Sequence, residues 1–503
     1  MKTYLLLLGA LMLLCGSLAA NNITVSNARV IAPTDYTTAD IAFDLSWDNS
    51  WRLDTSPNNW DAAWVFAKYR VDGGPWQHVT LGSVSSSPTD VTVELMDNKG
   101  AMIYHSVTAS GTASFTDVRL AWDVATDGYD GMGLLDLQVF AIEMVYVPEG
   151  AYSLGTGPDP DPANNEVDEF YTCCEDRLPY VVADAGAILV DSVAGALFFN
   201  DTEDPNATVS KRPALRTGSI PAAFPEGFSA FYLMKYEMSQ QQWVEFYNTL
   251  TPSQRTARNI SVQTSDRDND GWRNRVDTSL TNVASTTNPF VPVGYLSQND
   301  MYTYLDWAAL RPMTELEYEK AARGTAAPLN REYAWGTTAS RTGSYVLSNK
   351  GASNETVQGP TVSGTVRGNA TLGTTDDTEG IIAGPLRCGI FAASIPTASR
   401  LYAGASFYGI MELSGNQWES VVVMTSLEGR AFTNTHGDGT ITSQGLYDVA
   451  TWPTTRNGVG FKGGRADNGP NFGRVSDRTY TTLQFSTANS RYKWLQTRGV
   501  RGL

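Results

Sequence analysis

Short runs of alternating apolar and polar side chains mark the first part of the chain, between residues 21 and 142. The apolar members of these runs are Ile41, Phe43, Leu45 and Trp47, then Val65, Ala67, Tyr69 and Val71, then Leu135, Leu137 and Val139. A period of two residues predicts strands that bury one face. Turn-forming pairs such as Asp72-Gly73 and Asp127-Gly128 separate the runs. We therefore expect residues 21–142 to form an all-β sandwich domain.

This segment is also rich in tryptophan, and the pattern leaves two uses for these side chains. They are Trp47, Trp51, Trp60, Trp64, Trp76 and Trp122. Indole rings bury a large apolar area, which favours packing in the core of the sandwich. A face on which sugar rings stack is the alternative.

A helical pattern appears later, at residues 314–324. Thr314 is followed three residues later by Glu317, which is the capping-box spacing, and Gly324 suits the end of the helix. We expect Leu316, Ala321 and Ala322 to face a core, and Glu317, Glu319 and Lys320 to face water. The span from about 336 to 382 is poor in apolar residues and predicts a long surface loop system.

The first twenty residues have the features of a secretory signal peptide. Lys2 is followed by an apolar run from Leu5 to Leu14 and by small residues up to Ala20. Cys15 is a weaker candidate for lipid attachment, because the bulky Leu14 precedes it. No other segment approaches membrane length. We expect a mature protein that is secreted, either periplasmic or extracellular at the cell surface, with no transmembrane segment.

Charge and cysteine content narrow the possible partners. The formal net charge of −17 opposes non-specific nucleic-acid binding, which needs a basic face, and provides carboxylates for calcium.

The cysteines outside the predicted signal peptide are Cys173, Cys174 and Cys388. Adjacent cysteines rarely bond to each other, so either a bridge from Cys388 to one of the pair or isolated thiols is expected. The sequence does not predict the oligomeric state.

An acidic loop between residues 266 and 277 matches a calcium-binding template. Carboxylates at positions 1, 3 and 5, a glycine at 6 and oxygen donors at 7, 9 and 12 fit the spacing. The predicted ligands are Asp266, Asp268, Asp270, the carbonyl of Trp272, Asn274 and Asp277. A solvated acidic loop without a metal is the alternative.

Five segments between about 141 and 503 together resemble the formylglycine-generating-enzyme (sulfatase-modifying-factor) family. They are 141–150, 235–248, 311–324, 333–336 and 408–419, and the end of the chain from Phe461 to Arg501 adds to them. The resemblance implies an α+β, loop-rich domain at 143–503 with a C-type-lectin-like fold, following the β-sandwich.

The resemblance also implies a metal site and a catalytic pair. A calcium ion would bind Glu412, Glu419 and the carbonyls of Gly415 and Gln417; the alternative is that Glu419 pairs with an arginine. Two cysteines that carry the family's oxidase chemistry would fall at Asn468 and Gly473. A thiolate is the copper ligand and nucleophile in that chemistry, so we expect no copper. Arg474, Asp477 and Arg478 indicate a buried ion-pair network, and an anion-binding role is the alternative.

The segment 465–495 is the predicted recognition surface, because adaptable polar and aromatic residues are mixed in it. The predicted ligand-binding residues are Arg465, Asp467, Asn468, Asn471, Phe472, Tyr480, Gln484 and Tyr492. This layout is similar to the variable proteins of diversity-generating retroelements. We therefore expect a binder of a cell-surface glycan or protein. The alternatives are a structural component of a surface or secretion assembly and, less favoured, an oxidase.

Overall fold

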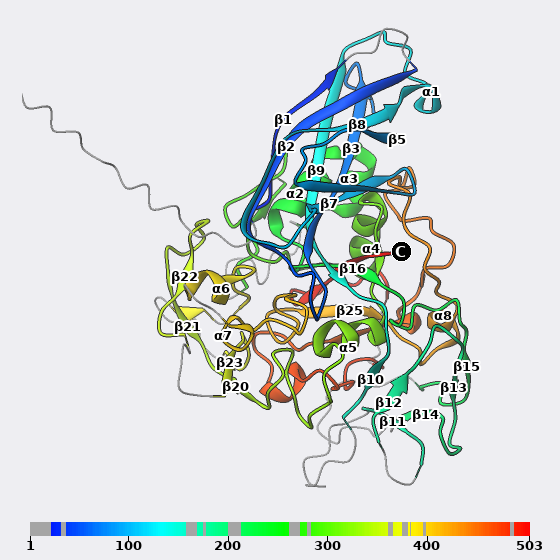
Figure 1. Ribbon diagram of the computed structural model, residues 1–503, viewed down its shortest axis with the longest axis vertical. Coiled ribbons are helices and arrows are strands. Elements are labelled where there is room, and N and C mark those ends of the chain that lie inside the picture. Colours follow the sequence, from blue (N-terminus) through cyan, green and yellow to red (C-terminus); the bar gives the residue numbers. More distant parts are fainter. Residues whose placement is uncertain are drawn as a thin grey trace, which may run out of the picture.

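The computed structural model describes residues 22–31, 37–156, 169–174, 178–199, 213–260, 272–278, 283–360, 366–374, 381–382, 384–395, 399–482 and 487–503 (Figure 1). The predicted signal peptide at 1–20, with Cys15, lies outside them. The fold is mixed α+β and loop-rich, with long strands in the N-terminal part and short elements elsewhere. In the part of the chain that the structure describes, the helices are too short or too polar to cross a bilayer.

The N-terminal part is a sandwich of two sheets. The first sheet contains, in spatial order, β1 (Thr24–Ile31), β2 (Thr38–Arg52), β8 (Ala109–Asp123) and β5 (Leu81–Ser86). Ile41, Phe43, Leu45 and Trp47 of β2 pack against the opposing sheet in one buried cluster, as the alternation predicts. The apolar positions of β2 therefore form the inner face of the sandwich.

The second sheet joins the N-terminal and C-terminal parts of the molecule. Its eight strands include, in order, β19 (Arg311–Pro312), β28 (Gly499–Gly502), β16 (Phe231–Met234), β9 (Leu135–Val147), β3 (Asp61–Val71), β7 (Gly100–His105) and β6 (Val91–Met96), with β4 (Gln77–His78) beside β3. The strand β9 pairs with β3 on one side and with β16 on the other. The expected boundary at residues 142 and 143 thus falls within a strand that both parts share.

Strand β3 is buried on both faces, whereas the alternation predicted one. Val65, Ala67 and Tyr69 face the sandwich core. Trp64 and Phe66 face the C-terminal part, where the Trp64 indole donates to the carbonyl of Ala308 at 2.8 Å. The intervening residues are themselves apolar, which is typical of strands covered on both sides.

The C-terminal part surrounds this sheet with short helices and small sheets. The helices are α1 (Val124–Asp127), α2 (Gln240–Thr249), α3 (Pro252–Arg258), α4 (Gln298–Trp307), α5 (Glu315–Arg323), α6 (Ile390–Ser394), α7 (Arg400–Ala403) and α8 (Leu427–Arg430), of which α1 belongs to the sandwich. A three-stranded sheet contains β26 (Val459–Lys462), β25 (Trp418–Val422) and β27 (Leu495–Gln496).

The remaining sheets are small. Residues 152–220 contain β10 (Tyr152–Leu154) with β12 (Tyr180–Val182), and β11 (Phe170–Thr172), β14 (Leu197–Phe199), β13 (Ile188–Val190) and β15 (Gly218–Ile220). Further pairs are β17 (Val276–Asp277) with β18 (Ser285–Thr286), and β20 (Ala339–Arg341) with β23 (Arg367–Asn369). The expected loop region at 336–382 therefore contains strands, among them β21 (Tyr345–Ser348), β22 (Thr356–Val357) and β24 (Ile381–Ile382).

Helix α5 confirms the predicted cap and corrects the predicted water-facing side. The Thr314 hydroxyl accepts from the Glu317 backbone, and the Glu317 side chain accepts from the Thr314 backbone. However, Glu317, Glu319 and Lys320 are as buried as the apolar residues of the helix. Other charged and polar groups of the protein satisfy them instead of water, because neighbouring segments cover the helix on every side.

The structure shows how deeply each tryptophan of the sandwich is buried and how the cysteines pair. Trp47, Trp64 and Trp122 are fully buried core residues, while the other three tryptophans of the sandwich are half-buried. The cysteine expectation was wrong: Cys173 and Cys174 form a disulfide with each other, and Cys388 is a buried free thiol.

Candidate functional site

The predicted recognition surface contains two aromatic groups, one at Trp494 and one at Trp418, and a buried residue, Asn468. In the first group, Trp494 stacks on Tyr492 with ring centroids 5.0 Å apart, and the Arg465 guanidinium lies 4.7 Å from the Trp494 ring centroid. Arg465 also forms an ion pair with Asp467 at 2.5 Å. Tyr492 and Trp494 are half-buried, so part of this group is open to a ligand.

The second aromatic group surrounds Trp418 at the start of β25. Tyr480 lies 4.4 Å and Phe472 6.2 Å from the Trp418 ring centroid, and the two smaller rings are 5.3 Å apart. Asn471 is exposed beside Phe472. Gln484 lies outside the described residues. The structure thus collects most of the predicted residues, but into two packed groups with the exposed Asn471 and Asp467 between them in sequence.

Asn468 is the exception on this surface, because it is only 9% exposed. Its main-chain carbonyl accepts from the Gly373 N–H at 2.8 Å, which fixes the loop against residues 371–374. Its side-chain oxygen is buried and has no hydrogen-bond partner within the described chain. Asn468 therefore presents an unsatisfied acceptor inside the protein, which costs free energy unless a small polar partner is present.

Gly473 is packed too closely to carry a side chain without a rearrangement. A Cβ atom built there would lie 2.6 Å from Leu372 Cδ1, and Leu372 is fully buried. Neither Asn468 nor Gly473 provides sulfur, and at 473 the space for it is filled by Leu372.

Three buried glutamates lie around one arginine beneath this surface. The Arg498 Nε donates to Glu419 at 2.6 Å, and Arg498 also donates to the carbonyls of Met234 and Lys235. Glu237 accepts from the Asn416 side chain and from the Gln417 backbone. Glu412 accepts from the Gly389 backbone at 2.8 Å. Burial raises the pKa of each of these carboxyls, and that of Glu412 to about 7.

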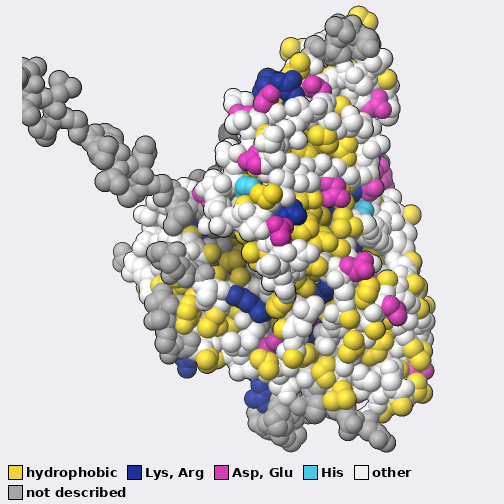
Figure 2. Space-filling view, viewed as in Figure 1, with side chains coloured by type: hydrophobic (Ala, Val, Ile, Leu, Met, Phe, Trp, Pro, Cys, Tyr) yellow, Lys and Arg dark blue, Asp and Glu magenta, His cyan; other side chains and the backbone are white. Residues whose placement is uncertain are grey.

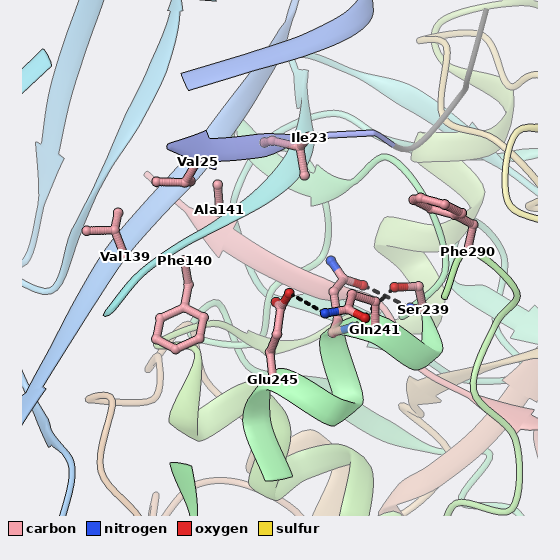
Figure 3. Close-up of a pocket in the computed structure, with 10 residues that line it drawn as sticks. Ile23, Val25, Val139, Phe140, Ala141, Ser239, Gln241, Glu245 and Phe290 are labelled. Atoms are coloured by element: carbon pink, nitrogen blue, oxygen red, sulfur yellow. Dashed lines mark hydrogen bonds between the residues drawn. The ribbon is translucent and has the colours of Figure 1, made fainter. Parts of the chain in front are cut away.

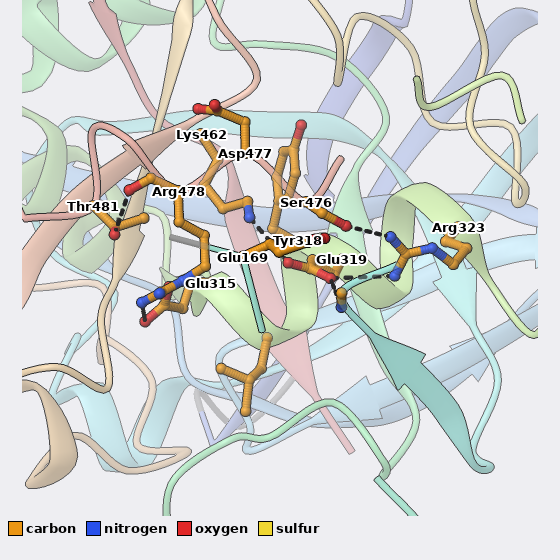
Figure 4. Close-up of polar contacts among 12 residues, drawn as sticks. Glu169, Glu315, Tyr318, Glu319, Arg323, Lys462, Ser476, Asp477, Arg478 and Thr481 are labelled. Atoms are coloured by element: carbon orange, nitrogen blue, oxygen red, sulfur yellow. Dashed lines mark hydrogen bonds and ion pairs between the residues drawn. The ribbon is translucent and has the colours of Figure 1, made fainter. Parts of the chain in front are cut away.

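A second ionic network packs around α5 and contains the predicted structural arginine (Figure 4). Arg478 pairs with Glu315 at 2.9 Å. Glu319 accepts from Lys462 at 3.1 Å and from Arg323 at 3.2 Å, and Arg323 also donates to the Ser476 hydroxyl. This network fixes the C-terminal segment to the helix. Of the three predicted residues, Arg478 forms a buried ion pair, whereas the Asp477 carboxylate accepts from the Thr479 backbone and hydroxyl.

The family model described as sulfatase-modifying factor enzyme 1-like domain matches residues 207–489, which is more than half of the 503 residues. The chain belongs to this family. Among curated proteins none matches the chain significantly. One solved structure, PvdO from Pseudomonas aeruginosa, is 14% identical, with a TM-score of 0.31; the match covers 72% of this chain and 95% of that one.

The family resemblance implies a calcium ion at Glu412 and Glu419, and the unpaired oxygens of these two side chains show whether they fit a cation. One oxygen of each carboxylate is buried without a hydrogen-bond partner in the described residues. Oxygen donors of this kind fit a hard cation. Arg498 already provides one positive charge here, which the sequence resemblance did not predict. The alternative of an arginine partner for Glu419 is thus also present, since Glu419 pairs with Arg498.

The predicted calcium loop is only partly described. Asp266, Asp268 and Asp270 lie outside the described residues. Trp272 and Asn274 are buried, and Asp277 is exposed in β17. Asn274 donates its amide to the carbonyl of Gly294 at 3.4 Å. The loop prediction stays a prediction.

Sequence reasoning missed two features of the site. Glu237 and Arg498 complete the buried charge cluster, and both stand inside segments that carried the family resemblance. It also did not bring Asp306 and Asp448 together with Asp438; one carboxylate oxygen from each of these residues lies within 4.8 Å of the others. Both oxygens of Asp306 accept backbone N–H groups of the other two residues, so this group orders the loop after His436.

Proposed function

We propose that this protein is a secreted or surface-displayed binding protein, built on a catalytically silent sulfatase-modifying-factor domain. The observation that carries the proposal is the pair Asn468 and Gly473, at the positions where the oxidases of the family have cysteines. Without a thiolate at either position, copper cannot be held and a substrate cysteine cannot be oxidised in the family's way.

The ligand would contact the surface formed by the Arg465, Tyr492 and Trp494 group and the neighbouring Asp467 and Asn471. Half-buried aromatic rings beside exposed amide and charged groups suit a glycan or a protein surface. Figure 2 shows charged side chains scattered over the visible face, with uncharged surface between them. In the proposed surface itself Arg465 is paired with Asp467, which supports recognition by stacking and hydrogen bonding more than by a concentrated charge.

Tyr492→Ala is the variant that tests this binding surface. We expect it to weaken binding to a ligand found on a glycan array or in a surface-protein panel by at least about tenfold, because half-buried aromatic residues dominate binding energy. The exposed Val366→Ala is the matched control and should bind as the natural protein does. Equal binding by both variants would place the ligand elsewhere.

The silent-domain part of the proposal has a separate test. A cysteine-containing sulfatase peptide incubated with the protein, oxygen and copper should keep its mass. A product with the mass of the aldehyde would overturn the proposal.

Sequencing the codons for 461–503 across many cells of one culture tests whether the surface is diversified. Substitutions confined to positions such as Arg465, Asn468, Asn471 and Tyr492 would identify a retroelement-diversified receptor. A uniform sequence would leave a fixed binder, and crosslinking to a stoichiometric neighbour would instead favour a component of a surface assembly.

Calcium is proposed as a stabilising ion, held by Glu412, Glu419 and the carbonyls of Gly415 and Gln417, and by the loop at 266–277. Calcium titration should raise the melting temperature, and EGTA should reverse the effect. Glu419→Gln should reduce the calcium-dependent shift through the first site, and Asp277→Asn through the second. A shift that neither variant reduces would place the ion elsewhere.

A further inference from the structure

A small pocket lies between the β-sandwich and helix α2, far in sequence from the surface at 465–495 (Figure 3). Its volume is about 170 Å³. One wall is apolar and comes from β1, the residue before it and β9, with Ile23, Val25, Val139 and Ala141. The facing wall comes from the first two turns of α2. Figure 3 shows the Glu245 side chain rising from α2 toward the apolar wall.

Glu245 is a carboxylate without a cation in the described part of the chain. Its one hydrogen-bond partner there is the Gln241 side chain, which donates to Oε1 at 2.9 Å. The described residues that line the pocket include no lysine or arginine. The Glu245 side chain is half-buried, and this partial burial without a compensating charge raises the pKa of its carboxyl.

An anionic ligand does not suit the same pocket, although the N-terminus of α2 borders it. The first N–H groups of the helix are already used inside the protein. Gln240 donates to the carbonyl of Val291, Gln241 to that of Pro289, and Gln242 to the Ser239 hydroxyl. A ligand would therefore meet the negative charge of Glu245 and not free helix donors.

We propose that this pocket binds a primary ammonium group on a short aliphatic stem. The ammonium would bind Glu245 Oε2, and the methylene groups would contact Val25, Val139 and Ala141. Because Gln241 occupies the other carboxylate oxygen, the site offers one strong acceptor, which suits the compact ammonium better than the two-pronged guanidinium. The ligand is either a free aliphatic amine or a lysine side chain of another protein.

Calorimetric titration at pH 7.5 tests the proposal with n-butylammonium as the probe. We expect saturable binding, and no binding of 1-butanol or butyrate, which keep the stem without the positive charge. Glu245→Gln preserves the acceptor for Gln241 and should weaken n-butylammonium binding at least about tenfold. The exposed Glu149→Gln is the matched control and should bind as the natural protein does.

A second variant removes the space and keeps the charge. Ala141→Leu fills the apolar wall, and it should also abolish binding, while circular dichroism and melting temperature confirm that it is folded. Binding of Nα-acetyl-lysine methylamide as strong as that of n-butylammonium would indicate a lysine side chain; much weaker binding would indicate a free amine. Absence of n-butylammonium binding, or binding unchanged by Glu245→Gln, would overturn the proposal.

Discussion

Gly473 packs against Leu372, so the addition of one methyl group at position 473 should affect stability. Gly473→Ala should destabilise the protein by about 1–3 kcal/mol, because the added carbon overpacks a buried site. Gly469→Ala is the matched control, since a Cβ there meets open space, and it should change stability by less than about 0.5 kcal/mol. Urea unfolding measures both.

The same contact predicts a coupling between the two residues. In a Leu372→Ala background the cost of Gly473→Ala should shrink, because the clashing atoms are gone. A cost that is the same in both backgrounds would mean that Leu372 is not what excludes a side chain from position 473.

Glu169 makes a pH prediction at the same scale. Burial raises the pKa of Glu169 to about 7, against an ordinary value of 4.5, and its carboxylate accepts from the Thr156 N–H and hydroxyl. The folded protein therefore holds this proton more tightly than the unfolded chain. The resulting stability is present below pH 4.5 and is lost as the pH rises through 7, by up to about 3 kcal/mol.

Glu169→Gln should remove this part of the pH dependence. The free energy of unfolding, measured with urea at pH 5 and pH 8, should fall less in the variant than in the natural protein. The exposed Glu149→Gln should follow the natural protein. Parallel pH profiles for all three proteins would contradict the prediction.

At the scale of single elements, the N-cap of helix α5 leads to a stability prediction. The Thr314 hydroxyl accepts from the Glu317 N–H at 3.1 Å and donates to the carbonyl of Pro225 at 2.7 Å. Thr314→Ala should therefore cost about 1–2 kcal/mol. Thr256→Ala in α3 removes an exposed hydroxyl that donates within its own helix, and it should be nearly neutral. Similar costs for both, by thermal unfolding, would exclude a capping role.

Elements also show the limit of pattern reasoning. The cap of α5 was predictable because it depends on residues three positions apart. The burial of Glu319 was not, because its partner Lys462 is 143 residues away. The same reason applies to β3, whose second buried face depends on α4 and the residues that follow it.

The shared strand β9 makes the prediction for the whole molecule. A chain that starts at residue 148 would leave β16 without one neighbour and expose the apolar residues that face β3. We expect it to bind a hydrophobic dye and to lack a cooperative melting transition. The full chain should unfold in one transition. Hydrogen exchange in β2 and in β28 should then report the same free energy of opening. A cooperative transition in the shortened chain would show two independent domains.

The sequence by itself determined the family, the α+β class and the absence of thiols at positions 468 and 473, because these depend on local motifs and residue identity. It also predicted a recognition segment at 465–495, and the structure packs the described aromatic residues of that segment into two groups. Tertiary structure alone decided the sheet that unites the two parts, the Cys173–Cys174 bond, the pairing of Arg498 with Glu419 and the pocket at Glu245. Each of these depends on contacts or packing geometry that no pattern along the chain encodes.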